Sequence, residues 1–252
     1  MNENWLNDGE RIDQLYSKDI QIIQSDTVFA FSLDAVLLAY FAKVPKKSQT
    51  RIVDLCAGNG AVGLFLSSET AGEISEVEIQ PRLADMADRS IKLNGLTEQM
   101  KVYNMDLANV TDVIEKDSVD VVTCNPPYFS DHALSKKNPN EYLAIARHEL
   151  KTTLSGVMKA TADVLKMNAK AYFVYRPDRL DDLFSEMKAH RLAPKKIQFV
   201  YPKPNTEANM VLVEAIKDGK PNGVRIQQPL IVYNNQNEYG DEVRGMLYGI
   251  NR

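Results

Sequence analysis

Short apolar runs alternate with longer amphipathic segments from residue 51 onward, and this alternation limits the fold more than any other property of the chain. Parallel strands need long crossover connections, and amphipathic helices supply them while covering the faces of the sheet. The pattern therefore predicts an α/β fold built on a parallel sheet. The sequence contains no internal repeat and no low-complexity segment that would interrupt it.

The predicted strands and helices follow one another closely. Strands are expected at residues 51–55, 73–79, 100–105, 118–124, 169–175, 195–201 and 207–216, and helices at 60–68, 81–93, 152–165 and 178–190. Pro81 favours a helix start, and Asn94-Gly95 favours a helix end. Asp178 is the expected cap of the last of these helices.

Composition narrows the class of protein. Cys56 and Cys124 end apolar runs, which predicts free buried thiols and neither a disulfide framework nor a metal site. The sequence has no secretory signal, and its apolar runs are too short for a membrane span, so a cytoplasmic protein is expected. The net charge of −4 argues weakly against a nucleic-acid partner, but the charge is unevenly distributed along the sequence. Residues 1–150 carry 14 Lys and Arg against 23 Asp and Glu, whereas residues 151–252 carry 16 Lys and Arg against 11 Asp and Glu. This asymmetry fits a polyanion on one face, or chance variation of surface charge.

A glycine-rich turn, Gly58-x-Gly60-x-x-Gly63, follows the first predicted strand. Glycine lets the backbone turn tightly and approach a ligand, although a turn without a ligand has the same pattern. The spacing also matches the dinucleotide fingerprint. Asp54, just before the turn, favours a different ligand, because a carboxylate suits a cation better than a pyrophosphate. S-adenosylmethionine carries an amine and a sulfonium, so the turn is predicted to bind this methyl donor.

Acidic residues end the next two predicted strands. Glu78 is expected to accept both hydroxyls of a ribose, because it lies one βαβ unit after Asp54. Glu76 is the rival if the assumed register is wrong, and a solvated carboxylate is the simpler alternative. Asp106 follows the third strand, where it would accept a hydrogen bond from the adenine amino group of the donor or cap a helix.

The tetrapeptide Asn125-Pro126-Pro127-Tyr128 comes directly after the fourth predicted strand. Its prolines fix φ and remove two backbone donors, so the segment is stiff and presents free carbonyls. The lone pair of an exocyclic adenine nitrogen is delocalised, and two acceptors on its hydrogens would direct that pair at a methyl group. The Asn125 amide and the Pro126 carbonyl can be those acceptors, while Tyr128 stacks on the base. The tetrapeptide thus predicts methylation of an amine, with catalysis coming mainly from positioning the amine against the methyl donor. The alternative is a rigid Pro-Pro turn followed by an aromatic pair that packs in the core. Phe129 would be a second wall that stacks on the base, or a core residue.

With Asp54, the glycine turn and Glu78, the tetrapeptide resembles the class I methyltransferases that act on amino groups. Residues 29–39, 146–149 and 209–214 are similar to segments of the bacterial tRNA (adenine-N6) methyltransferases, and the resemblance covers almost the whole chain. The best-known member of that family modifies valine tRNA at the adenine beside the anticodon. The resemblance implies an enzyme that uses S-adenosylmethionine to methylate N6 of an adenine in RNA, most simply in tRNA.

The resemblance also implies the architecture. It is a Rossmann-like fold whose seven-stranded, mostly parallel sheet has its last strand antiparallel. Residues 1–50 would be an N-terminal extension packing on the cofactor site, residues 51–217 the catalytic domain, and residues 218–252 a tail with an edge strand at 230–233. Within the extension, a strand is expected at 19–24 and a helix at 33–42, capped by Ser32. The resemblance places three residues near the methionine end of the cofactor: Phe31, Ser32 and Asp34.

The RNA surface is less sharply predicted. Phe129, Arg147 and Lys203 are the expected substrate-binding residues, beyond the ends of the strands. Four further candidates are Arg176, Lys195, Lys196 and Tyr201, and each basic one has the simpler interpretation of a solvated charge. No DNA, membrane or metal partner is expected, and a monomer is favoured.

Two other functions fit parts of the pattern. A protein glutamine-amide methyltransferase would use the same tetrapeptide chemistry, but such enzymes usually carry a larger helical N-terminal domain than the roughly 50 residues found here. An RNA chaperone that binds the cofactor without turnover is the third hypothesis, and the intact tetrapeptide argues against it.

Overall fold

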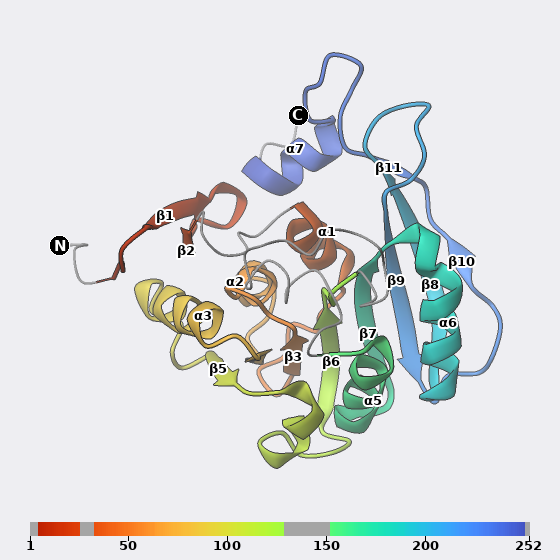
Figure 1. The fold of residues 1–252 in the computed structure, drawn as a ribbon, viewed down its shortest axis with the longest axis horizontal. Coiled ribbons are helices and arrows are strands. Elements are labelled where there is room, and N and C mark those ends of the chain that lie inside the picture. Colours follow the sequence, from red (N-terminus) through yellow and green to blue (C-terminus); the bar gives the residue numbers. More distant parts are fainter. Residues whose placement is uncertain (1–4, 26–32, 129–151, 250–252) are drawn as a thin grey trace.

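The computed structural model describes residues 5–25, 33–128 and 152–249, in which one large sheet carries helices on both faces (Figure 1). Seven long strands lie in the order β5-β4-β3-β6-β7-β9-β8. Their bounds are β3 (Arg51–Leu55), β4 (Glu73–Glu78), β5 (Met100–Asn104), β6 (Val119–Cys124), β7 (Leu165–Tyr175), β8 (Leu192–Tyr201) and β9 (Met210–Lys217).

The direction of the strands matches the predicted architecture. Strands β3 to β7 pair in parallel, whereas β9 runs antiparallel to both β7 and β8. Two short strands of the tail pair with β8 and make the sheet nine-stranded over the described residues: β11 (Leu230–Ile231), at the edge strand predicted for 230–233, and β10 (Arg225–Ile226), which was not predicted. Strands of two residues are too short to show a period in the sequence.

Helices form a layer on each face of the sheet. Buried residues of α1 (Leu33–Phe41), α2 (Ala61–Ser67) and α7 (Asp241–Tyr248) share one core with Ile52 and Val121. Buried residues of α5 (Leu154–Val164) and α6 (Leu180–Ala189) share the other with Val53 and Val122, since neighbours along a strand face opposite sides. Helix α3 (Pro81–Leu93) packs on β5 and β2, and it has the predicted bounds.

The extension contains a separate antiparallel hairpin of β1 (Glu10–Leu15) and β2 (Ile20–Ser25), joined by the short 3-10 helix η1 (Tyr16–Lys18). Only its second strand was predicted. Strand β1 is half-exposed and mostly polar, so it gives no apolar run of the kind that marks the central strands. The tail likewise contains a helix, α7, that was not predicted.

Several predicted boundaries are wrong. Strand β8 begins at 192 and not at 195, and β9 begins at 210 and not at 207. Strand β7 begins at Leu165 and not at 169, because residue 165 pairs with Val119 of β6. Asp178 does not cap α6: it lies in the 3-10 turn η3 (Pro177–Arg179), and α6 begins at Leu180 without a side-chain cap. Residues 5–25, 33–128 and 152–249 include no helix that is long and apolar enough to cross a membrane.

Candidate active site

The carboxyl ends of β3 and β6 meet at one edge of the sheet, because these strands are parallel neighbours. Leu55 and Cys124 are paired across them and are the last residues of the two strands. The glycine turn begins directly after Leu55, and the tetrapeptide begins with Asn125 directly after Cys124. Backbone pairing therefore brings the two predicted motifs side by side.

Glu78 ties the end of β4 to the glycine turn. Its two carboxylate oxygens accept hydrogen bonds from the backbone amides of Gly58 (2.8 Å) and Gln80 (2.8 Å). Gly58 and Gly60 both have positive φ, at 59° and 84°, which glycine adopts without strain. Burial raises the pKa of Glu78, and these two amide hydrogen bonds oppose the shift. The acid predicted for the ribose thus lies against the turn predicted for the donor.

Asp54 is almost fully buried beside the same turn. One carboxylate oxygen accepts a hydrogen bond of 2.6 Å from the Thr123 hydroxyl of β6, and the other has no hydrogen-bond partner among the residues that the structure describes. Burial raises the pKa of Asp54 to about 7, the Thr123 hydrogen bond opposes this rise, and the nearby Glu78 adds to it. A buried carboxylate oxygen without a partner is a suitable acceptor for an ammonium group.

Glu76, the alternative to Glu78 as the predicted ribose-binding residue, lies beneath the glycine turn. Its side chain is fully buried there, and no described residue forms a hydrogen bond with its two carboxyl oxygens. A Cβ on Gly60 would lie 2.6 Å from one of them, and a Cβ on Gly63 would collide with the other. Burial, reinforced by Asp54 and Glu78, raises the pKa of Glu76 well above its usual range. The glycines here thus leave room for an acid beneath the turn as well as for a ligand above it.

Asp106 caps a helix, which is one of the two roles predicted for it. Its carboxylate accepts a hydrogen bond of 2.9 Å from the Ala108 amide and caps the 3-10 helix η2 (Leu107–Asp112). The adjacent Met105 amide donates to the Glu78 carbonyl at 3.0 Å. Asp106 therefore lies next to the Glu78 end of the site, and its contact with an adenine stays a prediction.

The tetrapeptide is joined to helix α1 through Tyr128. The Tyr128 hydroxyl hydrogen-bonds to the Asp34 carboxylate at 2.8 Å and closely contacts the Asn125 amide oxygen. Burial and the Asp34 carboxylate raise the pKa of Tyr128 well above its usual range, so the phenol keeps its proton. The oxygen that was predicted to bind a substrate amine thus already meets an O–H group.

Two further residues hold Tyr128. Its ring packs edge-on against Tyr175 of β7, with 5.9 Å between the centroids. The Arg179 guanidinium donates a 3.0 Å hydrogen bond to the Tyr128 carbonyl and lies 5.5 Å from the centre of the Tyr175 ring. These contacts fix the position of the tetrapeptide, while stacking of Tyr128 on a base stays a prediction.

A family model described as Methyltransferase small domain matches residues 19–185, about two thirds of the chain. The chain belongs to this family. The match runs from the extension through the glycine turn and the tetrapeptide into α6. The methyltransferase therefore has its paired motifs inside the matched region.

Curated relatives of the methyltransferase share one name. A protein of Bacteroides fragilis named tRNA1(Val) (adenine(37)-N6)-methyltransferase is 26% identical over 180 residues, which are 71% of this chain and 74% of the relative. A protein of the same name from Actinobacillus pleuropneumoniae is 24% identical over 224 residues, 88% of this chain and 90% of the relative.

Solved structures agree on the fold of the methyltransferase. A predicted O-methyltransferase from Agrobacterium tumefaciens superposes with a TM-score of 0.67 at 21% identity, covering 86% of this chain and 96% of the other. A geranyl diphosphate methyltransferase solved with sinefungin gives a TM-score of 0.55 at 11% identity, covering 73% and 77%. At such identities the likeness establishes the Rossmann-like fold alone.

The predicted substrate residues of the methyltransferase are only partly described. Phe31, Ser32, Phe129 and Arg147 lie outside the described residues. Lys203 is exposed in the loop after β8, whose carboxyl end lies at the same edge of the sheet as that of β7. The other basic candidates have protein partners: Arg176 pairs with Asp178, Lys195 donates to the Lys220 carbonyl, and Lys196 pairs with Glu214.

Three residues of the methyltransferase site were not found from the sequence: Thr123, Tyr175 and Arg179. Thr123 precedes Cys124 in β6, and its only signal was a hydroxyl inside an apolar strand. Tyr175 and Arg179 lie some fifty residues after the tetrapeptide they support. Their contacts depend on the pairing of β6 with β7, which no local pattern records.

Proposed function

We propose that this methyltransferase transfers the methyl group of S-adenosylmethionine to N6 of an adenine in tRNA, next to the anticodon. The observation that carries the proposal is the pairing of Leu55 with Cys124, since it sets the glycine turn beside the tetrapeptide. The names of the curated relatives support tRNA as the substrate and adenine 37 as the target.

The donor half of the proposed site is acidic. The free oxygen of Asp54 would accept the ammonium of the methionine moiety, and Glu78 would accept the ribose hydroxyls. When bound, S-adenosylmethionine supplies a methyl group on a sulfonium. Gly58 leaves space for it above the turn, because no atom lies within 4 Å of the position that a Cβ on this residue would take.

The half of the proposed site that would bind the target amine, the acceptor half, is the tetrapeptide, which is uncharged and rigid. The Asn125 amide oxygen and the Pro126 carbonyl would bind the two N–H hydrogens of the target amine and orient its lone pair. The contact between the Tyr128 hydroxyl and Asn125 supports this role, because it places an O–H donor where the amine is expected. During substrate binding the hydroxyl would leave Asn125 and keep its hydrogen bond to Asp34.

The extension residues 1–50 are proposed to form part of the site. Asp34, in the first turn of α1, holds the hydroxyl of Tyr128. This contact agrees with the expected position of Asp34 beside the methionine end of the donor.

Replacement of Asn125 by Ala tests the proposal. We expect Asn125→Ala to abolish methyl transfer to tRNA while donor affinity stays within about twofold of wild type, because the acceptor half alone is changed. Transfer is measured with labelled donor and unmodified bulk tRNA, and the product is identified by mass spectrometry of nucleosides. Label on a protein amide in place of tRNA, or loss of donor binding in the variant, would refute the assigned chemistry.

A further inference from the structure

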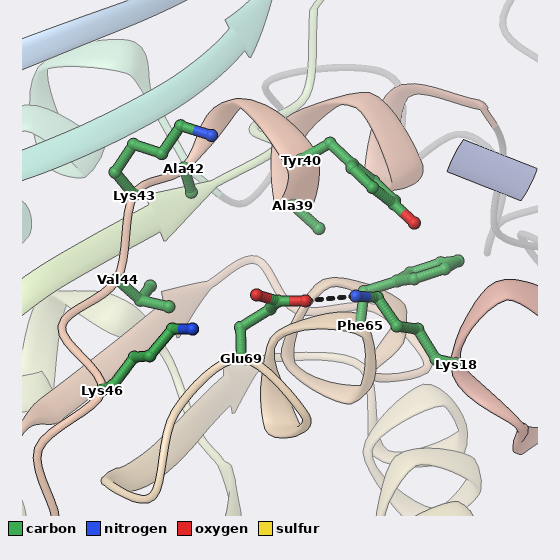
Figure 2. A pocket seen from close by; sticks show the side chains of 9 residues that line it. All are labelled: Lys18, Ala39, Tyr40, Ala42, Lys43, Val44, Lys46, Phe65 and Glu69. Carbon is green, nitrogen blue, oxygen red and sulfur yellow. Dashed lines mark hydrogen bonds and ion pairs between the residues drawn. The ribbon is translucent and has the colours of Figure 1, made fainter. Parts of the chain in front are cut away.

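A hollow lies away from the tetrapeptide, between α1 and α2 (Figure 2). Its volume is about 260 Å³, and its apolar wall comes from α1, α2 and the connector that follows α1. Three lysines line it: Lys18 from η1, and Lys43 and Lys46 from the connector. Glu69, after α2, is the one acidic residue in the lining.

The lysines of this hollow are unevenly paired. Lys18 forms an ion pair with Glu69 and lies 5.2 Å from the centre of the Tyr40 ring. Neither Lys43 nor Lys46 has an ion pair or a side-chain hydrogen bond with any described residue. In Figure 2, Lys46 and Lys18 extend toward Glu69 from opposite sides. Lys18, and with it Lys46 and Lys43, lowers the pKa of Glu69, so one permanent negative charge faces three positive ones.

The connector that carries Lys43 and Lys46 is held in place. The Tyr172 hydroxyl donates to the Lys43 carbonyl at 3.3 Å, and the Thr70 hydroxyl donates to the Pro45 carbonyl at 2.7 Å. The backbone is therefore fixed on both sides of Val44, while the two ammonium groups have no hydrogen-bond or ion-pair partner in the described part of the chain. Such preorganisation lowers the entropic cost of binding an anion.

The excess of positive charge here contrasts with its surroundings in the sequence. The first 150 residues carry 23 Asp and Glu against 14 Lys and Arg, yet three of those cations line one hollow. Two unpaired ammonium groups beside apolar surface suit a phosphodiester, which needs point charges and no directional recognition.

We propose that this hollow, defined by Lys18, Lys43, Lys46 and Glu69, binds a backbone phosphate of the RNA substrate at a distance from the methylated base. The inference rests on the proposed function. Helix α1 connects the two places: Asp34 of its first turn contacts Tyr128, and Tyr40 of its last turn lines the hollow. With a rise of about 1.5 Å per residue, Tyr40 lies about 9 Å along the helix from Asp34. The hollow therefore acts on RNA affinity and leaves the reacting atoms alone.

The double variant Lys43→Ala/Lys46→Ala tests the proposal against a matched control, Lys116→Ala/Lys188→Ala. The control removes two exposed lysines outside the lining of the hollow. Binding of unmodified tRNA is measured over a range of KCl concentrations. We expect the hollow variant to lose roughly tenfold in affinity and about 1 to 2 units of the slope of log Kd against log salt. The control should match wild type, and methyl transfer at saturating tRNA should keep its kcat in both variants.

Glu69→Gln supplies a test that misfolding cannot mimic. It removes the one carboxylate of the hollow, so tRNA affinity should rise by several-fold. Equal tRNA affinities for wild type, Lys43→Ala/Lys46→Ala and Glu69→Gln would overturn the proposal. So would binding of inorganic phosphate that depends on Lys43 and Lys46 while tRNA binding does not. Failure of the proposed function looks different: wild-type protein would then transfer no methyl group to tRNA.

Discussion

Under the proposed function, the buried carboxyl of Asp54 makes donor binding depend on pH. Its free oxygen must be ionised to hold an ammonium group, and its pKa lies at about 7 because the side chain is buried. Below that pH a proton must leave before the donor binds. We expect the affinity for S-adenosylmethionine to fall by up to about tenfold per pH unit as the pH drops below 7. Calorimetric titrations between mildly acidic and mildly basic pH measure this dependence.

Asp54→Asn should weaken donor binding and flatten its pH dependence, because the amide carries no charge at any pH. Glu98→Gln, a change at an exposed acid, is the matched control and should keep the wild-type profile. An affinity of wild-type protein that does not change with pH would exclude Asp54 as the ammonium acceptor.

Glu76 makes the protein less stable as the pH rises, whereas an acid in a salt bridge makes a protein more stable as the pH rises. Burial and two neighbouring acids raise its folded-state pKa, so the folded protein keeps a proton that the unfolded chain releases. Its contribution to stability is full below the unfolded pKa of about 4.5 and is lost as the pH rises toward the folded pKa. We expect Glu76→Gln to reduce the fall of unfolding free energy with pH by up to about 1.4 kcal/mol per unit. Urea unfolding at several pH values tests this, and an unchanged slope would contradict it.

At the level of elements, α2 lies close to β4 because Gly63 has no side chain. A Cβ at this position would collide with the Glu76 carboxyl. We expect Gly63→Ala to destabilise the fold by about 1 to 3 kcal/mol through overpacking. In a Glu76→Ala background the same change should cost much less, since the colliding group is gone. Thermal unfolding of the single and double variants measures the coupling, and strictly additive effects would argue against this contact.

The strands and helices that were predicted correctly share one property. β3, β6 and α3 each carry a complete local pattern: an apolar β-branched run, or an amphipathic segment with Pro81 at its start and Asn94-Gly95 after it. The start of β7 was missed because Leu165 joins the strand by pairing with Val119 of β6, and a register shift separates this pair from the next one, Val121 with Lys170. β10 was missed because two exposed residues have no pattern at all.

In the candidate site, too, some residues could be predicted from the sequence and others could not. Asp54, Gly58, Glu78 and Asn125 lie at positions that strand ends and turn glycines mark in the sequence. Their partners do not: Thr123 meets Asp54 through the register of β3 with β6, and Asp34 meets Tyr128 across 94 positions of sequence. Sequence patterns predict the position of a site residue on its own strand, turn or helix. Which site residues contact one another depends on how the strands and helices pack in the folded protein.

At the scale of the whole molecule, the tail belongs to the main core. Leu230, Val232 and Val243 are buried in the same cluster as Ile52 of β3. We expect Val243→Ala, in α7, to lower the unfolding free energy by about 1 to 3 kcal/mol. Val224→Ala, at an exposed position of the same tail, should change it by less than about 0.5 kcal/mol. Equal effects in a denaturant titration would mean that the tail is not docked.

The pairing of Leu55 with Cys124 also has a consequence for biosynthesis. The two halves of the catalytic pocket belong to strands separated by 69 positions and an intervening pair of strands. Such contacts form late, since chain entropy opposes closing a long loop until the intermediate layers are in place. A nascent chain that still lacks β6 therefore cannot bring the glycine turn beside the tetrapeptide. We expect such an unfinished chain to have no methyltransferase activity and to leave the cell's tRNA unmodified.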